Sequence, residues 1–398
     1  MTFSTLPLSY CTNVHPGRSL DEVLAGLVDY TAPVRKRCGR PVAAGLWLAK
    51  PVIDELLDDS NLRRQLQQTL LDHQLCCYTL NAFPYGDFHS DRVKEQVYLP
   101  DWSEPTRLNY TLGCARILSE LMPPGTEGSI STVPLGSKLL TQPADFQERC
   151  LKQLLDLAIA LNDLHDETGC CIRLAIEPEP FCILERTDEV LQFFDRLWDA
   201  ASRRDCETIA RRHLGVCYDV CHQAVEFEDV AQSVKDLDRQ GIRINKVHIT
   251  CAIQLTRPGE NSAGRDALES YIEPRYLHQT MGRLPSGEIL RADDLSEDLW
   301  DLELQPGPWH KAVAWRIHFH VPVHAERLGP LDTTRQELKS ALQAVSELEY
   351  APHLEVETYT WEVLPGDQKM PLVEGLTQEL TATWKLLDEI YIATGVGR

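Results

Sequence analysis

Long hydrophobic runs are absent from this sequence. No apolar stretch in its 398 residues approaches the roughly 18–20 residues that a helix needs to span a bilayer, so we expect no membrane insertion. The first residues, MTFSTLPLSYC, contain no basic stretch followed by an apolar block, and a secretory signal is therefore not expected either. These absences predict a cytoplasmic protein.

Positive charge is also scarce. The chain has 39 Lys and Arg against 60 Asp and Glu, which gives a formal net charge of −21. A protein with this excess of negative charge repels phosphate backbones at long range, so we expect no nucleic-acid partner. Hydrophobic residues nevertheless make up 43% of the chain, as is typical of a protein that folds around a core.

Three short motifs that would indicate particular cofactors are missing. The 13 cysteines include no CxxC pair, so zinc-ribbon and thioredoxin-like sites have no support and free thiols are expected. The first strand-like run is followed by TNVHPG, which fits neither GxGxxG nor GxxxxGK[ST]. Because those loops bind dinucleotides and nucleotide phosphates, nucleotide binding has little support.

The sequence does contain a regular alternation of short apolar runs and helical patterns. Helical patterns such as Ser19–Arg37, Pro105–Leu121 and Ala144–Glu167 separate runs that are typical of parallel strands buried on both faces. The alternation predicts an α/β fold, a (β/α)8 TIM barrel formed by residues 1–398 as one domain, with an open doubly wound sheet as the alternative. The predicted strands are Leu6–Cys11, Val42–Leu48, Leu75–Leu80, Gly128–Val133, Cys171–Ile176, Leu214–Tyr218, Ile244–Ile249 and Leu354–Val356.

One segment departs from this alternation. Residues 251–314 are rich in proline, glycine and charge, and a further strand-like run, Trp315–Val321, follows them. Long irregular segments in compact domains are often lids or binding loops, and the mouth of a TIM barrel carries its active site. We therefore predict an insertion that forms a lid over the mouth. The alternative is a peripheral decoration without a role in the site.

Charged residues stand at the ends of four consecutive predicted strands, namely Glu177, Asp219, His248 and Glu357. Such positions face the site of a TIM barrel, so three carboxylates would cluster around one imidazole. Clustered like charges are costly unless a cation joins them. Three oxygen ligands and one nitrogen suit one divalent metal, Mn²⁺, Mg²⁺, Co²⁺ or Zn²⁺. Taken singly, each residue has an alternative as a solvated loop residue, a helix cap or a core histidine.

Five further polar residues are candidates for substrate binding. His15 and Asn81 end the first and third predicted strands, and Glu179 lies two residues after Glu177. His318 and His320 recur with a period of two in IHFHVPVH, which places them on one face of a strand. This pair predicts either a wall of the site or a second metal site. A partly exposed strand with polar alternation is the alternative.

Longer motifs resemble a known superfamily. The segment GVCYDVCH (Gly215–His222) is similar to the Asp-x-x-His motif on the sixth strand of xylose-isomerase-like TIM-barrel proteins, which include sugar phosphate isomerases and epimerases. The segments around Glu177, His248 and Glu357 match its fifth, seventh and eighth strands in order and spacing. More narrowly, CTNVHPG, NAFPYG and VKEQVYLPDW resemble the EboE-type "metabolite traffic" proteins, and the likeness covers nearly the whole chain.

The resemblance implies roles for individual residues. In ketose epimerases of this superfamily, Glu, Asp, His and Glu at these strand ends bind one divalent metal, which implies a metal site formed by Glu177, Asp219, His248 and Glu357. The two glutamates also transfer protons, which implies catalytic roles for Glu177 and Glu357, and the motif histidine, here His222, orients substrate. Those epimerases carry an arginine shortly after the strand-seven histidine, where this sequence reads TCA. Endonuclease-IV-type members hold a metal cluster, which implies a second metal as an alternative.

These inferences predict a metal-dependent isomerase or epimerase that acts on a sugar, cyclitol or related polyhydroxy carbonyl metabolite. Two glutamates favour catalysis over binding alone, since binding does not need two bases. The alternatives are a metal-dependent phosphoesterase similar to endonuclease IV and a non-catalytic protein for metabolite binding or traffic. The expected partner is the small polyhydroxy substrate, and a homo-oligomer or pathway partners are further candidates.

Overall fold

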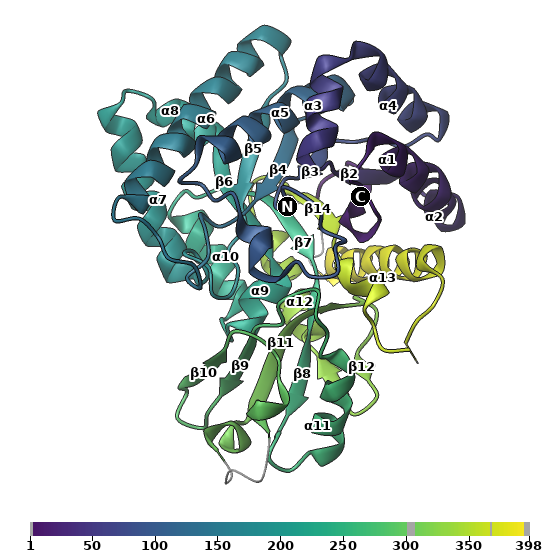
Figure 1. The fold of residues 1–398 in the computed structure, drawn as a ribbon, viewed down its shortest axis with the longest axis vertical. Coiled ribbons are helices and arrows are strands. Elements are labelled where there is room, and N and C mark those ends of the chain that lie inside the picture. The colour runs from purple at the N-terminus through teal and green to yellow at the C-terminus, as the bar shows by residue number, and fades with distance from the viewer. Residues whose placement is uncertain (1–2, 301–306, 367, 394–398) are drawn as a thin grey trace.

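The computed structural model describes residues 3–300, 307–366 and 368–393. Eight parallel strands form a closed barrel in the order β1-β14-β7-β6-β5-β4-β3-β2 (Figure 1). The predicted (β/α)8 barrel is therefore confirmed. The barrel strands are β1 (Leu8–Cys11), β2 (Val42–Trp47), β3 (Thr79–Asn81), β4 (Gly128–Thr132), β5 (Ile172–Ile176), β6 (Leu214–Asp219), β7 (Ile244–Ile249) and β14 (His353–Val356).

The observed strands overlap the predicted runs, but the third run was placed too early. The prediction began at Leu75, whereas β3 begins at Thr79. Gln74 adopts a positive φ of 52°, which turns the chain just before the run. Cys76 then forms only an isolated bridge to Ala43 before regular pairing starts. Leu75 is buried all the same, so its apolar character reflects packing at the turn.

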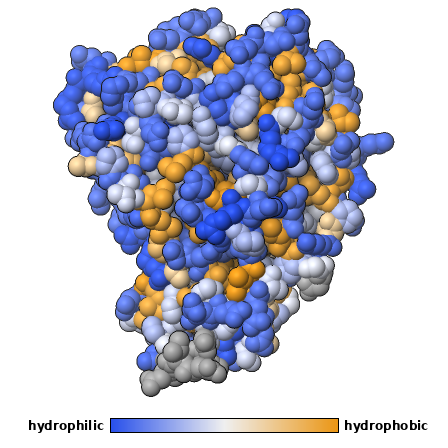
Figure 2. Space-filling model, in the orientation of Figure 1, coloured by the Kyte–Doolittle hydropathy of each residue, from blue (hydrophilic) through white to orange (hydrophobic). Residues whose placement is uncertain are grey.

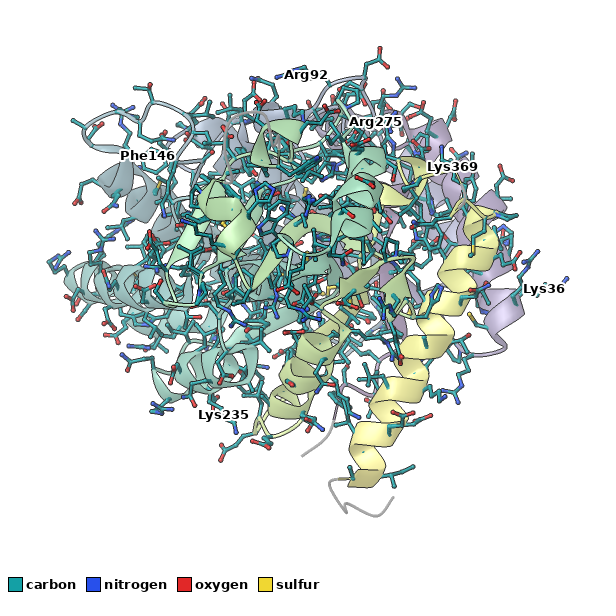
Figure 3. The ribbon with its side chains drawn as sticks, turned by 90° about the horizontal axis from the view of Figure 1, so that it is seen from below. Lys36, Arg92, Phe146, Lys235, Arg275 and Lys369 are labelled. Carbon is teal, nitrogen blue, oxygen red and sulfur yellow. The ribbon has the colours of Figure 1, made fainter. Side chains whose placement is uncertain are left out.

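Helices surround the barrel and bury the outer faces of its strands. In the view from below, α13 lies beside α2, which carries the labelled Lys36 (Figure 3). The helices of the barrel are α1 (Leu20–Gly26), α2 (Ala32–Cys38), α3 (Lys50–Asp58), α4 (Ser60–Asp72), α5 (Pro105–Leu121), α6 (Phe146–Thr168), α7 (Thr187–Arg203), α8 (Glu207–His213), α9 (Val220–Val225), α10 (Val230–Arg239), α12 (Arg335–Val345) and α13 (Leu372–Ala393).

A second sheet follows β7 and projects from one side of the barrel (Figure 1). Its six strands run in the order β10-β9-β11-β8-β13-β12. The segment predicted as an irregular insertion, 251–314, contains β8, β9 and β10 of this sheet, but the sheet continues to Thr333. Residues 301–306 of the insertion lie outside the described residues. The elements are β8 (Cys251–Thr256), α11 (Ser262–Leu268), β9 (Thr280–Arg283), β10 (Ile289–Ala292), β11 (Ala314–Val321), β12 (Arg327–Leu328) and β13 (Leu331–Thr333).

The surface is mixed in character. On the face shown in Figure 2, hydrophilic residues cover most of the molecule and hydrophobic residues occur in scattered groups. Within the described ranges, no helix is both long enough and apolar enough to cross a membrane.

Candidate metal centre and substrate pocket

The four residues predicted as metal ligands converge at one end of the barrel. Glu177 directly follows β5, Asp219 ends β6, His248 lies in β7 and Glu357 directly follows β14. Parallel strands place all four at the carboxyl ends of neighbouring strands, where the site of a TIM barrel lies. Each side chain is buried, and one potential ligand atom from each lies within 4.8 Å of the others.

His248 lies at the centre of this group. Its Nδ1 atom is 2.9 Å from Glu177 Oε1, 3.5 Å from Asp219 Oδ2 and 3.6 Å from Glu357 Oε2. Glu177 Oε2 and Asp219 Oδ2 are buried and have no hydrogen-bond partner among the described residues. Because buried carboxylate oxygens require a donor or a cation, the set fits a divalent metal in its chemistry as well as its spacing.

The electrostatics of this group also favour a bound cation. Burial raises the pKa of Glu357, and the neighbouring Glu177 and Asp219 raise it further against the opposing effect of His248. Burial alone would lower the pKa of His248, but Glu177 and Glu357 are among the neighbours that raise it well above its ordinary value. The cluster therefore draws positive charge to its centre, here a second proton on His248, and a metal ion would take the place of that proton.

Amide side chains fix the orientation of Glu357. Its Oε1 accepts hydrogen bonds from Asn13 Nδ2 at 2.8 Å and from Asn81 Nδ2 at 3.2 Å. Oε2 is thereby left to face His248. Asn81 was predicted, whereas Asn13 was missed as a site residue although it lies in the CTNVHPG motif. The sequence feature that could have identified Asn13 is an amide side chain just after the first strand, two residues before His15.

A second cluster, which we call the histidine cluster, consists of His222, His318 and His320. The first belongs to α9 and the other two to β11 of the second sheet. The ring centroids of His222 and His318 are 4.5 Å apart, and those of His222 and His320 are 5.5 Å apart. Asp219, His222 and His320 also offer ligand atoms within 4.8 Å of one another, so the histidine cluster adjoins the first group.

Hydrogen bonds determine which ring nitrogen of each histidine carries a proton. The Nδ1 atoms of His222, His318 and His320 face Pro178 O at 2.9 Å, Gln279 Oε1 at 2.6 Å and Glu357 O at 2.9 Å. Each of these partners is an acceptor, so each Nδ1 carries the hydrogen. In the neutral rings every Nε2 then carries a lone pair.

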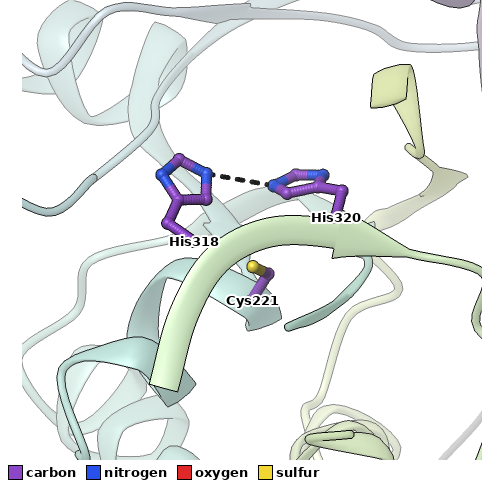
Figure 4. A group of neighbouring side chains, drawn as sticks. All are labelled: Cys221, His318 and His320. Atoms are coloured by element: carbon purple, nitrogen blue, oxygen red, sulfur yellow. Dashed lines mark hydrogen bonds between the residues drawn. The ribbon is translucent and has the colours of Figure 1, made fainter. Parts of the chain in front are cut away.

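Two of these lone pairs meet. His318 Nε2 and His320 Nε2 are 3.2 Å apart, with Cys221 nearby (Figure 4). Burial lowers the pKa of His222 and lowers that of His318 well below its ordinary value, which favours the neutral rings. This contact is a hydrogen bond when one of the two Nε2 atoms carries a proton, and a cation between the two nitrogens would take the place of that proton. The histidine cluster thus has the donor atoms and the spacing of a cation site.

A pocket with an empty volume of about 520 Å³ opens above both groups. Its acidic and histidine lining residues are Glu177, Glu179, Glu357, His222 and His318. No arginine occurs among the described residues that line it. The remaining wall is largely apolar and aromatic and consists of Phe83, Pro84, Phe88, Val93, Val97, Tyr98, Tyr276, Leu277 and Tyr359, with Asn13, Asn81 and Lys94 as polar members.

Glu179, a predicted substrate-binding residue, lies in this pocket as a third carboxyl group. Its Oε1 accepts hydrogen bonds from Tyr98 OH at 2.7 Å and Gln279 Nε2 at 3.4 Å. Burial raises its pKa to about 8, so it carries a proton at neutral pH. Lys94, the cation of the wall, is already paired with Asp294.

His15 is not among the described residues that line this pocket, and its role in substrate binding stays a prediction. Its Nε2 is 3.1 Å from Tyr10 OH, and its ring packs 4.8 Å from that of Tyr30. The short turn Thr12–Val14 directs the chain back against α1, so His15 lines a separate small cavity behind β1. Burial lowers its pKa to about 3, as expected for a neutral core histidine.

Comparisons with known proteins identify the fold. No family model matches the chain, and no curated protein matches it significantly. A D-tagatose 3-epimerase-like protein matches 98% of this chain and 100% of its own, with a TM-score of 0.52 and 10% sequence identity. A xylose isomerase-like TIM barrel protein from Mycobacterium smegmatis, in complex with magnesium, matches 98% of this chain and 99% of its own, with a TM-score of 0.53 and 12% identity.

The chain therefore has the xylose isomerase-like TIM-barrel fold. At these identities the likeness concerns the fold, and the chemistry rests on the residues of the site. The narrower resemblance to EboE-type proteins stays a prediction.

Proposed function

We propose that this protein is a metal-dependent isomerase or epimerase that acts on a sugar, cyclitol or related polyhydroxy carbonyl compound. The observation that carries this proposal is the convergence of Glu177, Asp219, His248 and Glu357 at the base of a pocket, with two carboxylate oxygens that have no hydrogen-bond partner in the described ranges. The epimerase-like and magnesium-bound proteins that share the fold support it.

One divalent metal, Mn²⁺, Zn²⁺, Mg²⁺ or Co²⁺, would be held by His248 Nδ1 and by oxygens of the three carboxylates. When bound, such an ion supplies charge stabilisation for the enediolate that forms when a proton leaves the carbon next to a carbonyl group. All remaining steps fall to the protein. The polar residues of the pocket hold the substrate, and its aromatic wall excludes water.

Glu177 and Glu357 are the proposed proton-transfer pair. They come from β5 and β14, which β6 and β7 separate around the barrel, so they approach a substrate carbon from different directions. One carboxylate removes the proton and the other returns it on the opposite face, which gives epimerisation. Return of the proton to the adjacent carbon gives isomerisation. His222, whose Nδ1 lies 4.0 Å from Glu177 Oε1, is proposed to orient the substrate.

The pocket favours an uncharged substrate. A phosphate group would face the carboxylates of Glu177 and Glu357, and among the described residues of the wall it would find no free cation, since Lys94 is paired with Asp294. Phosphate sites ordinarily supply arginine, lysine or a helix N-terminus. Tyr276 and Phe88 offer flat apolar surfaces instead, which suit the C–H face of a sugar or cyclitol ring.

We also propose that a second metal ion binds between His318 Nε2 and His320 Nε2, which form with Cys221 a group whose ligand atoms all lie within 4.8 Å of one another. Tetrahedral zinc with Zn–N bonds of about 2.0–2.1 Å separates two nitrogen ligands by about 3.3 Å, close to the 3.2 Å between His318 Nε2 and His320 Nε2. Two adjacent ions are also found in hydrolases of phosphate esters, which keeps a phosphoesterase as the second candidate function. The acidic pocket favours proton transfer over that candidate.

Two measurements test the proposal. Purified protein should contain divalent metal by elemental analysis. It should also exchange substrate C–H hydrogen for deuterium in D₂O with at least one member of a panel of neutral sugars and cyclitols. Glu357→Gln should abolish this exchange. Hydrolysis of phosphate esters without exchange would favour the phosphoesterase, whereas ligand binding without either reaction would indicate a metabolite-binding protein.

A further inference from the structure

A charged pair lies inside the barrel, one layer below the metal site. Lys246 on β7 and Glu355 on β14 are fully buried, and Lys246 Nζ is 2.6 Å from Glu355 Oε1. The interior of a TIM barrel is ordinarily filled by layers of bulky apolar side chains. A buried ion pair is weak evidence for stability, because removing two charges from water costs about as much as their attraction returns. This pair therefore calls for another explanation.

The surrounding strands are shaped to hold the pair. Lys246 Nζ also donates to Leu80 O at 3.4 Å and to Ser131 Oγ at 3.3 Å. Glu355 Oε2 accepts a hydrogen bond from Ser9 Oγ at 2.7 Å. Gly45 on β2 leaves the space that Glu355 occupies, since a Cβ atom there would lie 1.5 Å from Oε2. The position of the Glu355 carboxylate is thus fixed from several strands.

Glu355 also faces the metal ligand His248. The two residues are paired neighbours on adjacent strands, and His248 Nε2 lies 3.3 Å from Glu355 Oε1. The opposite ring nitrogen, Nδ1, points into the group formed by Glu177, Asp219 and Glu357. His248 Nε2 and Glu355 Oε1 do not meet hydrogen-bond geometry in this structure, but an ionised carboxylate at this distance can only accept and therefore favours a hydrogen on the ring nitrogen beside it. The Nδ1 lone pair is then available to a cation.

We propose that Glu355, held by Lys246, is a positioning residue that keeps the hydrogen of His248 on Nε2 and directs Nδ1 to the metal. Outer carboxylates that bind a ligating histidine in this way commonly orient it and increase its basicity. Lys246 also balances the charge of Glu355, so that the layer adds no net negative charge beneath three carboxylates. This role rests on the proposed metal site.

The test compares metal affinity with stability. In the double variant Lys246→Met/Glu355→Met, apolar side chains of similar length replace the pair. The expected melting temperature of the metal-free variant is equal to or above that of the wild type, because the desolvation cost disappears. Its affinity for Zn²⁺ or Co²⁺ should nevertheless fall roughly 10–100-fold. The visible spectrum of bound Co²⁺ should also change, since the histidine ligand is no longer fixed.

Glu355→Gln, which keeps the size of the side chain, serves if the double variant does not fold. Glu226→Gln is the matched control, because Glu226 is also buried and paired with a cation, Arg291, at 2.7 Å. It should leave the metal affinity and the Co²⁺ spectrum unchanged.

The possible outcomes separate this proposal from the one on which it rests. A wild-type protein that binds neither Zn²⁺ nor Co²⁺ would overturn the metal site itself. If the wild type binds metal and the Glu355 variants bind it equally well with an unchanged spectrum, only the positioning role is overturned. A loss of stability that accompanies the loss of affinity in every Glu355 variant, including Glu355→Gln, would make the pair a structural feature and would likewise overturn it.

Discussion

At the scale of single residues, Asp219 performs two tasks with its two oxygens. Oδ1 accepts hydrogen bonds from Thr250 Oγ1 at 2.7 Å and from the backbone N–H of His222 at 3.1 Å, and the second of these bonds caps the N-terminus of α9. Oδ2 is buried beside His248, and no described residue donates a hydrogen bond to it. One carboxylate thus fixes the start of a helix and leaves an oxygen for a cation, so its two functions are separable by substitution.

Asp219→Asn tests this separation. The amide oxygen keeps the helix cap, but the amide N–H group replaces the metal-facing oxygen with a donor. We expect metal affinity to fall by at least about 100-fold, because even outer-shell changes cost 10–100-fold. Asp229→Asn is the control, since Asp229 caps α10 in the same way through Gln232 N at 3.0 Å, far from the site. Equal metal content in both variants, measured by elemental analysis, would contradict the assignment.

The histidine cluster gives a second prediction at this scale. His318→Ala removes one of the two facing Nε2 atoms and should reduce the metal content of the saturated protein from two ions to one. Binding of the first ion should persist, because His318 is not one of the four residues that form the first site. His324→Ala is the control from the same run of histidines, as His324 lies beyond the end of β11. A wild-type stoichiometry of one ion would refute the second site.

At the scale of elements, β2 contributes to the site because its residue 45 is a glycine, which has no Cβ atom to displace Glu355. Gly45→Ala would place a Cβ atom 1.5 Å from Glu355 Oε2 and 2.7 Å from Ser9 Oγ. Overpacking of this kind costs about 1–3 kcal/mol, and we expect that loss in urea denaturation together with weaker metal binding. Gly86→Ala meets no atom within 4 Å and should change neither quantity. Wild-type stability and affinity in Gly45→Ala would show that Glu355 can move freely.

The sequence predicted the barrel and much of the site because both rest on local patterns. Apolar runs marked the strands, and a charged residue at each strand end marked Glu177, Asp219, His248 and Glu357. Lys246 and Glu355 were visible in the same way, as charges inside buried strands two residues before His248 and Glu357. Their place beneath the metal site was missed, because a sequence period of two residues shows that side chains share one face of a strand. It does not show which layer of the barrel they occupy.

The second sheet was harder to predict for a different reason. Its strands β9 and β10 have four residues each and include glycine, arginine or threonine, so they lack the apolar runs that identified the barrel strands. β9 is stabilised by antiparallel pairing with β11, which is distant in sequence, and β10 pairs with β9. Gln279, which fixes the proton on His318, was missed for the same reason. Only tertiary pairing places it beside the pocket.

At the scale of the whole molecule, buried carboxyl groups should make the metal-free protein sensitive to pH. Burial raises the pKa of Glu379 to about 7, although Thr358, Trp361 and Val323 donate hydrogen bonds to it. An unfolded glutamate has a pKa of about 4.3. Between these values the folded state binds more protons than the unfolded state, so this group lowers stability as pH rises from about 4.5 to 7.

The variant Glu379→Gln isolates this effect, because glutamine does not titrate. The stability of the wild type relative to the variant should decrease as pH rises from 5 to 7 and then level off. The measurement is the free energy of unfolding of both proteins in urea at each pH, with chelator present. A difference that stays constant over this interval would show that Glu379 is ionised throughout.

The second sheet lies in the chain between β7 and β14, the two strands that carry His248 and Glu357, and this order has a consequence for biosynthesis. As the ribosome extends the chain, β1 to β7 emerge before the second sheet, but β14 emerges only after it and must then enter between β7 and β1. This closure must wait until the second sheet has been synthesised. Until it occurs, Glu357 is absent from the site and the barrel retains two open edges. A nascent chain stalled before His353 is therefore expected to expose those edges to chaperones and proteases.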